Sequence, residues 1–423
     1  MAFFEIDDEF LRELGENWRI LLVAFFCMLF AFSAPALLIP FIYPDVIREF
    51  GWTREQATLL ASAKYLTGAV IAIVIGRFID VVGVRRVLIV VSTAGGLALL
   101  SFLWTQGLVA YYVAGVMLGV AGAGTMVSIK VLISRTFHES QGTAMGFAML
   151  GTSIGTVVVP IAITYLIEGY GWRVGTAVLS AGVWIIALPL MIFFLDDNTF
   201  KIEPPAAAGI DGLPATVSLD AAGALMMKPQ FWMIAAAVFA VGFVDQAFIQ
   251  HQVLYLREDL GLSAGYVAAG ISAIGLVGIV VRPLVGAVFD RWSVRGVRFV
   301  YCMLSLSCLV ALAALNTYVF AAFVVLRAIG HAAVLLDTTV LAKHTFGLAN
   351  IGVVLGVLTA AVNLGFAAGP WFVARMYAST GSYVAAFVIC AGIGVLAAII
   401  LLPVKPVYWL HQRNYRSATQ IAK

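Results

Sequence analysis

Twelve long apolar runs constrain this chain more than any other feature of its sequence. Each is close to the roughly 20 apolar residues that a helix needs to cross a bilayer. Only 11% of the 423 residues are charged, whereas about 25% are charged in a soluble domain, whose surface must face water. The sequence therefore predicts an all-α, multi-pass integral membrane protein. The predicted transmembrane helices are 19–43, 57–79, 86–105, 108–134, 142–167, 173–195, 231–256, 264–289, 297–316, 318–344, 351–377 and 382–404.

One long polar stretch, 196–230, divides these helices into two groups of six. It predicts a cytoplasmic linker between an N-terminal bundle, 19–195, and a C-terminal bundle, 231–404, with a cytoplasmic N-terminal segment (1–18) and a cytoplasmic tail (405–423). Lysine and arginine accumulate on the cytoplasmic side of membrane proteins. With both termini inside, 16 of the 25 Lys and Arg residues face the cytoplasm and five face outside. We therefore expect cytoplasmic termini and a location in the cell (inner) membrane.

Landmark residues recur along the chain at a constant offset of 210 positions. A matched register over most of the chain indicates a duplicated six-helix unit. Parallel repeats of this kind are typical of transporters, whose substrate site lies at the repeat interface. The repeated pairs are Gly51 and Gly261, Gly146 and Gly356, Pro160 and Pro370, and Gly171 and Gly381.

The longest repeated motif is "GRFIDVVGVRR", 76–86, after the second helix, which returns as "GAVFDRWSVRG", 286–296. The motif resembles the signature of the major facilitator superfamily, although Ser293 stands where the second glycine is expected. The resemblance implies that the loop acids pair with nearby arginines and a neighbouring helix terminus, which latches the outward-facing state. A purely topogenic role, in which the arginines hold the loop inside, is the alternative. The implied gating residues are Asp80, Arg85, Arg86, Asp290 and Arg295.

Six charged residues lie inside the predicted helices, away from their ends. A charge at the centre of a membrane helix costs at least ~2.5–3.5 kcal/mol, so such residues usually face a cavity or a partner. Four bases against two acids leave an excess of positive charge, which should attract an anion. The bases are Lys64, Lys130, Arg282 and Arg327, and the acids are Asp245 and Asp337.

The four bases differ in what their positions allow. Arg282 lies about 12 Å along its helix from the inner end, and a guanidinium can hold a carboxylate by two hydrogen bonds; a structural ion pair is the alternative. Lys130 can bind substrate or snorkel to the inner interface. For Lys64 we predict a gating ion pair, and snorkelling to the interface or contact with the substrate are the alternatives. Arg327 shares a helix face with His331 at i,i+4, which fits either proton coupling or helix packing.

Asp245 lies near the middle of its predicted helix, among polar neighbours. It can bind a proton together with the substrate and release it on the other side, or it can form a permanent salt bridge with an embedded base. Asp337, nearer the inner end, allows the same two interpretations. The further substrate-binding candidates are Gln250 and His251, and the repeat partners Ser153 and Asn363.

Three stretches, 135–160, 251–271 continuing through 278–290, and 344–356, resemble the branch of this superfamily that contains the monocarboxylate transporters and the oxalate/formate antiporters. In that branch an arginine before a proline in the eighth helix holds the substrate carboxylate, and the resemblance implies this role for Arg282. The eukaryotic members have an acid four residues earlier, where this chain has Gly278. The proton-coupling acid must therefore lie elsewhere, which makes Asp245 the candidate.

The sequence thus predicts a secondary active transporter that moves a small organic anion, a monocarboxylate by preference, with a proton by rocker-type alternating access. An organic anion exchanger without proton coupling is the alternative. The chain contains no nucleotide-binding loop, no metal-ligand spacing and no basic tract for nucleic acid. We therefore expect no enzyme activity, no cofactor, no metal and no nucleic-acid partner, and we expect the protein to function as a monomer in the lipid bilayer.

Overall fold

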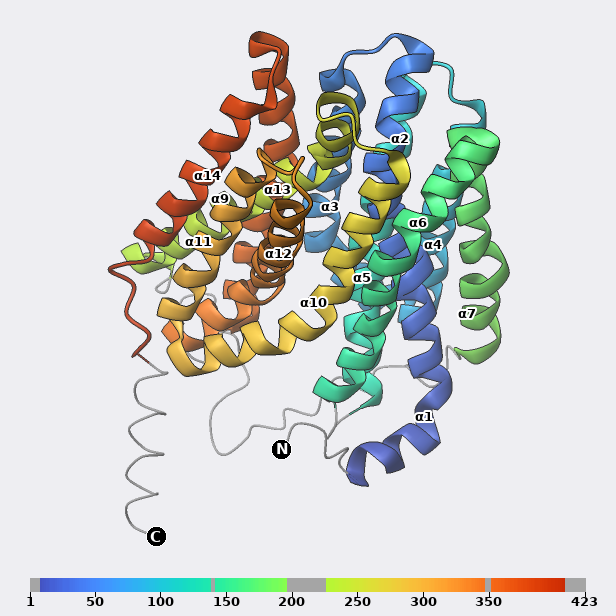
Figure 1. Cartoon of the computed structure of the whole chain (residues 1–423). Helices are drawn as coiled ribbons and strands as arrows, with labels where there is room; N and C mark the ends of the chain where they lie inside the picture. The colour runs from blue at the N-terminus through green and yellow to red at the C-terminus, as the bar shows by residue number, and fades with distance from the viewer. Residues whose placement is uncertain (1–7, 138–140, 196–225, 347–350, 408–423) are drawn as a thin grey trace. The chain divides into compact units, whose positions relative to one another are not determined.

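The computed structural model describes residues 8–137, 141–195, 226–346 and 351–407. These residues form long helices joined by short connections, and no strand occurs among them (Figure 1). The chain divides into two compact units. Unit 1 consists of Met1–Pro204 with Leu256–Leu276, and unit 2 of Pro205–Tyr255 with Val277–Lys423.

Unit 1 begins with a long, nearly continuous helix made of α1 (Asp8–Phe26), a π-helical segment (Cys27–Ser33) and α2 (Ala34–Phe50). The following helices are α3 (Arg54–Val82), α4 (Val84–Ser101), α5 (Leu108–Thr136), α6 (Gln141–Ala181) and α7 (Leu188–Phe194). Unit 2 contains α9 (Pro229–Leu254), α11 (Val294–Ala311), α12 (Thr317–Phe346), α13 (Ile351–Thr380) and α14 (Tyr383–Ile400). Helix α10 (Ala264–Trp292) begins in unit 1 and ends in unit 2.

Eleven helices in the described part of the chain are long and apolar enough to cross a membrane. One of them, Ala144–Phe194, is 51 residues long. It covers two predicted spans, because Gly171 has φ 81° and ψ 161° and interrupts the helix there. The predicted all-α fold with twelve transmembrane spans is therefore confirmed, with boundaries that differ by a few residues.

Helix starts follow from local capping. The side chain of Thr53 accepts a hydrogen bond from the backbone N of Gln56 at 3.1 Å, and the Gln56 side chain accepts one from the backbone N of Thr53 at 2.9 Å. This reciprocal capping box satisfies two backbone donors at the start of α3. Ser382 is the N-cap of α14, and its Oγ accepts a hydrogen bond from the backbone N of Val384 at 3.2 Å.

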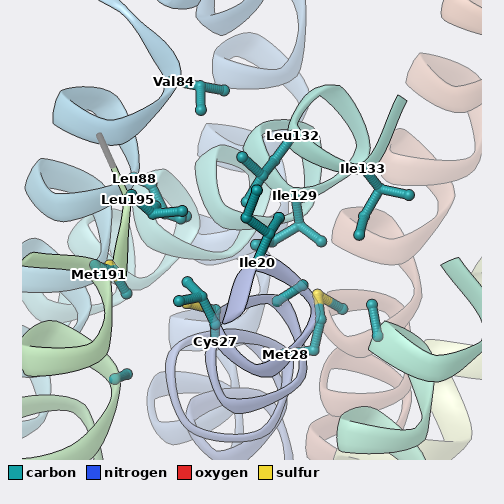
Figure 2. Packing of buried hydrophobic residues seen from close by; sticks show 14 of the residues in the cluster. Ile20, Cys27, Met28, Val84, Leu88, Ile129, Leu132, Ile133, Met191 and Leu195 are labelled. Carbon is teal, nitrogen blue, oxygen red and sulfur yellow. The ribbon is translucent and has the colours of Figure 1, made fainter. Parts of the chain in front are cut away.

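The core of unit 1 lies where α1, α4, α5 and α7 meet (Figure 2). Its centre includes Cys27, Met28, Leu88, Ile129 and Met191, all fully or almost fully buried. Lipid tails are as apolar as these side chains, so helix association in a membrane depends on packing and on small residues that permit close approach.

Close backbone approach at glycine joins helices in both units. A Cβ at Gly119 of α5 would collide with the Lys64 carbonyl in α3, and one at Gly365 of α13 would collide with the Phe239 carbonyl in α9. These glycines belong to Gly-x-x-x-Gly spacings in the sequence, 115–119 and 365–369. The small residues therefore bring the helix backbones of each pair together.

The internal duplication is visible in the backbone. The six described residues with positive φ form three pairs, each separated by 210 positions: Gly51 with Gly261, Gly83 with Ser293, and Gly171 with Gly381. Each pair follows a helix of one repeat and the matching helix of the other. The two halves therefore share their turn geometry as well as their sequence landmarks, which confirms the predicted pseudo-repeats.

Ser293 is the one non-glycine residue among these six. It adopts φ 50° and ψ −130°, a region that costs a non-glycine residue of order 1–3 kcal/mol. Its Oγ lies 2.9 Å from Nδ1 of the buried His344, near the C-terminal end of α12. The hydroxyl therefore offsets part of the backbone strain.

We expect Ser293→Gly to unfold at a higher temperature than Ser293→Ala. Both variants lose the bond to His344, but only glycine adopts the positive φ without strain, so the difference should be about 1 kcal/mol or more. The measurement is thermal unfolding of the two purified proteins in the same detergent, followed by tryptophan fluorescence. Equal unfolding temperatures would show that the turn carries no strain.

Candidate functional site

The densest group of buried charges in the described residues lies in unit 2, between α9 and α12. Asp245 of α9 is fully buried, and Arg327 of α12 donates from Nη2 to its Oδ1 at 2.5 Å and to its backbone carbonyl at 3.0 Å. Nδ1 of His331 lies 3.1 Å from both carboxylate oxygens. Because Arg327 and His331 are four residues apart, α12 presents both on one face. We call Asp245, Arg327 and His331 the charged triad.

The side chains of the charged triad differ in how much of their surface is exposed. The side chains of Asp245 and Arg327 are 0% and 1% exposed, whereas that of His331 is 27% exposed. The Arg327 guanidinium also lies over the Phe248 ring, 5.2 Å from its centroid. A guanidinium remains protonated in proteins, so it supplies Asp245 with a permanent counter-charge.

Polar side chains extend the triad along α9. Nε2 of Gln246 lies 3.4 Å from Oδ2 of Asp245, and Nε2 of Gln250 donates to Oε1 of Gln246 at 3.1 Å. In the residue after Gln250, Nε2 of His251 lies 2.9 Å from the Pro370 carbonyl and Nδ1 lies 3.1 Å from the Tyr383 hydroxyl. Since a carbonyl only accepts, Nε2 of His251 carries the hydrogen in this arrangement. Both ring nitrogens are thus engaged within unit 2.

Asp337 forms a second buried acidic site on α12. Its side chain is 1% exposed. The Tyr301 hydroxyl of α11 donates to Oδ2 at 2.6 Å, and the Thr338 hydroxyl donates to Oδ1 at 2.9 Å, joined by the Thr338 backbone N–H. Among the described residues no basic side chain forms an ion pair or a hydrogen bond with this carboxyl group. Asp245 and Asp337 therefore have opposite environments, one paired with a cation and one held by neutral donors.

Lys64 of α3 is the most unusual charged residue of unit 1. It is 6% exposed, and its buried Nζ has no hydrogen-bond partner in the described part of the structure. The ammonium lies 4.6 Å from the centroid of the Tyr65 ring. Among the described residues Lys64 forms no ion pair, and its side chain does not reach the surface.

The remaining predicted substrate-binding residues belong to four helices, α5 and α6 in unit 1 and α10 and α13 in unit 2. Lys130 of α5 is exposed and Arg282 of α10 is half-buried. Oγ of the buried Ser153 lies 3.5 Å from the Met149 carbonyl, and Nδ2 of Asn363 donates to the Thr359 carbonyl at 3.0 Å. Ser153 and Asn363 thus bond back to their own helices.

The predicted gating residues are placed as follows. Arg85, which follows the Gly83 turn, donates from Nη2 to the Ile192 carbonyl near the end of α7 at 2.9 Å. A cation at a helix C-terminus interacts favourably with the helix dipole. Arg86, Asp290 and Arg295 are exposed. The side chain of Asp80 lies outside what the structure describes.

Unit 1 also contains an ionic group that no sequence pattern indicated. Arg54 donates to Asp259 at 2.5 Å, Arg173 pairs with Glu49, and Nε1 of Trp172 donates to Glu49 at 2.7 Å. Arg54 and Asp259 are 205 positions apart, so no local spacing could have revealed the pair. The described residues contain no group of three or more His, Cys, Asp or Glu side chains that could hold a metal ion.

Three known transporters share part of their sequence with this chain. The oxalate:formate antiporter of Oxalobacter formigenes is 29% identical over 174 residues, which cover 40% of this chain and 39% of the antiporter. The probable nitrate/nitrite transporter NarK2 of Mycobacterium tuberculosis is 26% identical over 261 residues, 59% of this chain and 61% of NarK2. Monocarboxylate transporter 14 of Mus musculus is 22% identical over 160 residues, 38% of this chain and 31% of that transporter. In each case the chain matches less than two thirds of the relative's length.

A solved structure and a family model match much more of the chain. The structure is a bacterial homologue of the human lysosomal transporter Spinster, in an inward-facing and unoccupied conformation. It matches with a TM-score of 0.71 at 16% identity, over 95% of this chain and 98% of that one, which supports the fold alone. The model of the Major Facilitator Superfamily matches residues 21–334. Together with the twelve helices and the duplicated motif, this match establishes that the chain belongs to the Major Facilitator Superfamily of transporters.

Proposed function

We propose that the protein is a secondary transporter that moves a small organic anion, a monocarboxylate by preference, together with a proton. The observation that carries the anion part is the buried Lys64 ammonium, which has no hydrogen-bond partner among the described residues. A buried charge without a partner is costly, and charged residues within membrane helices mark substrate and ion pathways. Lys64 is therefore expected to meet an anion during the transport cycle.

The balance of embedded charge supports the same conclusion. Arg327 compensates Asp245 at 2.5 Å, so this pair adds no net charge. The remaining embedded bases, Lys64, Lys130 and Arg282, exceed the one remaining acid, Asp337. The names of the three relatives refer to oxalate and formate, nitrate and nitrite, and monocarboxylates, all of them small anions. The guanidinium of Arg282 suits a carboxylate, which it can hold by two hydrogen bonds.

Anion exchange without proton coupling is the second candidate function. The observation that favours it is the Asp245–Arg327 pair, because an acid that is tied to a permanent cation has no need to exchange a proton. The environment of Asp337 favours symport instead, since its buried carboxyl group has no such cation among the described residues. We therefore place symport first.

The proposal also covers the membrane location, the topology and the gating motif of the protein. The protein would lie in the cell (inner) membrane as a monomer with cytoplasmic termini, and its two six-helix bundles, joined by 196–230, would alternate in access by a rocker-type motion. The bond from Arg85 to the Ile192 carbonyl supports a role for the 76–86 motif as a cytoplasmic latch. Asp80, Arg86, Asp290 and Arg295 are its other proposed members.

The direct test is uptake of labelled formate, lactate and oxalate into liposomes that contain the purified protein, with acid outside. We expect accumulation above equilibrium that collapses with a protonophore, and at least about 30-fold lower uptake in Arg282→Gln, since truncating one partner of a buried charge pair costs 2–5 kcal/mol. Uptake that ignores the proton gradient but requires an anion inside would establish exchange. No uptake of any of the three would reject a carboxylate substrate.

A further inference from the structure

We infer that Asp337, and not Asp245, is the carboxyl group that takes up and releases the coupling proton. The inference rests on the proposed proton symport and names the residue that performs it. It follows from comparing what each of the two buried acids would lose if its charge disappeared, because a coupling site must be occupied by the proton in one half of the cycle and empty in the other.

Asp245 is poorly suited to this exchange. Its carboxylate receives the 2.5 Å bond from Arg327, whose side chain is only 1% exposed. A proton on Asp245 would leave this guanidinium buried without its counter-ion, which is strongly destabilising. Nδ1 of His331 lies 3.1 Å from the same two oxygens, so two side chains of α12 contact the carboxylate. The structure therefore favours a permanently ionised Asp245 whose role is to hold α9 against α12.

Asp337 is not paired with a buried cation among the described residues. Its carboxyl oxygens accept from Tyr301 and Thr338, which are both neutral. Protonation of Asp337 would leave no buried cation without a partner. A tyrosine hydroxyl can donate or accept, so the 2.6 Å contact between Tyr301 and Oδ2 can persist in both states, with the hydroxyl donating to the carboxylate and accepting from the carboxylic acid. The same set of neighbours thus accommodates both protonation states.

The charged groups on the helices packed against α12 do not change this conclusion. On α9 the nearest is Asp245, which is paired with Arg327. On α11, Arg298 precedes Tyr301 by one turn, but no ion pair joins it to Asp337. On α13, Arg375 lies 24 residues after Ile351, the first residue of the helix. It is therefore about 36 Å along the helix axis from that first residue. On α12 itself, His331 bonds to Asp245, and Lys343 is exposed.

The test separates net transport from exchange in liposomes. Exchange of labelled for unlabelled lactate or formate needs no proton release, so a permanently neutral side chain at position 337 should sustain it. We expect accumulation driven by a proton gradient to be at least about tenfold lower in Asp337→Asn than in the wild type. The exchange rate of the variant should stay within about twofold of the wild-type rate. Glu168→Gln, the same change at an exposed acid of α6, is the matched control and should behave like the wild type.

The outcomes distinguish this inference from the proposed function. Gradient-driven accumulation that persists in Asp337→Asn while the wild type is proton-coupled would overturn the inference alone. A wild type that accumulates nothing from the gradient would overturn symport itself. Because the asparagine variant is usable only if it folds, its monodispersity in detergent is checked first.

A measurement on folded Tyr301→Phe protein keeps the inference testable if Asp337→Asn is unstable. In infrared difference spectra between acid and alkaline solutions, the carboxyl C=O band should shift in Tyr301→Phe, because Asp337 loses one hydrogen bond there. The band should not shift in Glu168→Gln. A carboxyl band that is identical in wild type and Tyr301→Phe would assign the titrating group elsewhere and overturn the inference.

Discussion

Replacing Asp245 by asparagine is expected to destabilise the protein by about 3–5 kcal/mol, because it leaves the buried Arg327 guanidinium without its carboxylate. The structure gives Arg327 no alternative acid among the described residues, and its side chain is only 1% exposed. Arg327→Met should be destabilising by a similar amount, since it leaves the Asp245 carboxylate buried with His331 as its only basic neighbour in the triad.

The double variant Asp245→Asn with Arg327→Met is the informative measurement. Removing both partners of a buried pair is often nearly neutral, so the double variant should recover most of the unfolding temperature that each single variant loses. Thermal unfolding in detergent of the four proteins closes a double-mutant cycle. Losses that simply add would show that the two charges do not stabilise one another and that each side chain acts through separate contacts.

This cycle also bears on how transport data should be interpreted. An Asp245→Asn variant that fails to transport has lost a structural ion pair as well as an acid, so its failure says nothing specific about protons. If the double variant recovers both folding and accumulation driven by a proton gradient, Asp245 cannot be the proton carrier. The stability cycle is therefore a precondition for any assignment of coupling residues in unit 2.

The sequence predicted the fold because the fold depends on features that are local in the chain. Apolar runs and turn glycines are properties of short segments, and the 210-residue offset compares such segments between the two halves; the structure reproduces the apolar helices and, at the six positive-φ turns, the offset. Ser293 illustrates the strength of the register: it keeps a positive φ where its partner Gly83 has one, although serine disfavours that conformation.

The site was only partly predictable, since it depends on how each helix is rotated about its axis. The sequence identified Asp245, Arg327 and His331 as embedded or adjacent polar residues, but it left open whether Asp245 was paired. The choice depends on contacts between residues 82 and 86 positions apart. Tyr301 carried no signal of its own, because an isolated tyrosine in an apolar helix is common, and its importance appears only when α11 places it 2.6 Å from Asp337.

Lys64 shows why position along a helix does not determine exposure. The sequence predicted a gating ion pair for Lys64, with snorkelling to the interface or substrate contact as the alternatives. The structure instead brings α3 so close to Gly119 of α5 that the Lys64 backbone carbonyl faces the glycine, and the ammonium is buried beside Tyr65. The contact depends on a small residue more than 50 positions away in the sequence.

Replacing Lys64 by methionine is expected to raise stability and to weaken transport at the same time. Methionine has a similar shape and no charge, so it removes a buried ammonium that has no hydrogen-bond partner among the described residues and should be stabilising. If Lys64 binds the transported anion, the variant also loses a hydrogen bond to a charged group, worth about 1.5–3 kcal/mol. Uptake at low concentrations of labelled formate, lactate or oxalate should then fall by about 10- to 100-fold.

The two readouts together discriminate function from packing. A lysine buried only as an accident of packing would give a more stable variant with unchanged transport, and a purely structural lysine would give a less stable one. Lys228→Met, the same exchange at an exposed lysine, controls for loss of charge in general. A gain in unfolding temperature combined with lost uptake is the result expected of a residue that is retained, at a cost in stability, because it binds the substrate.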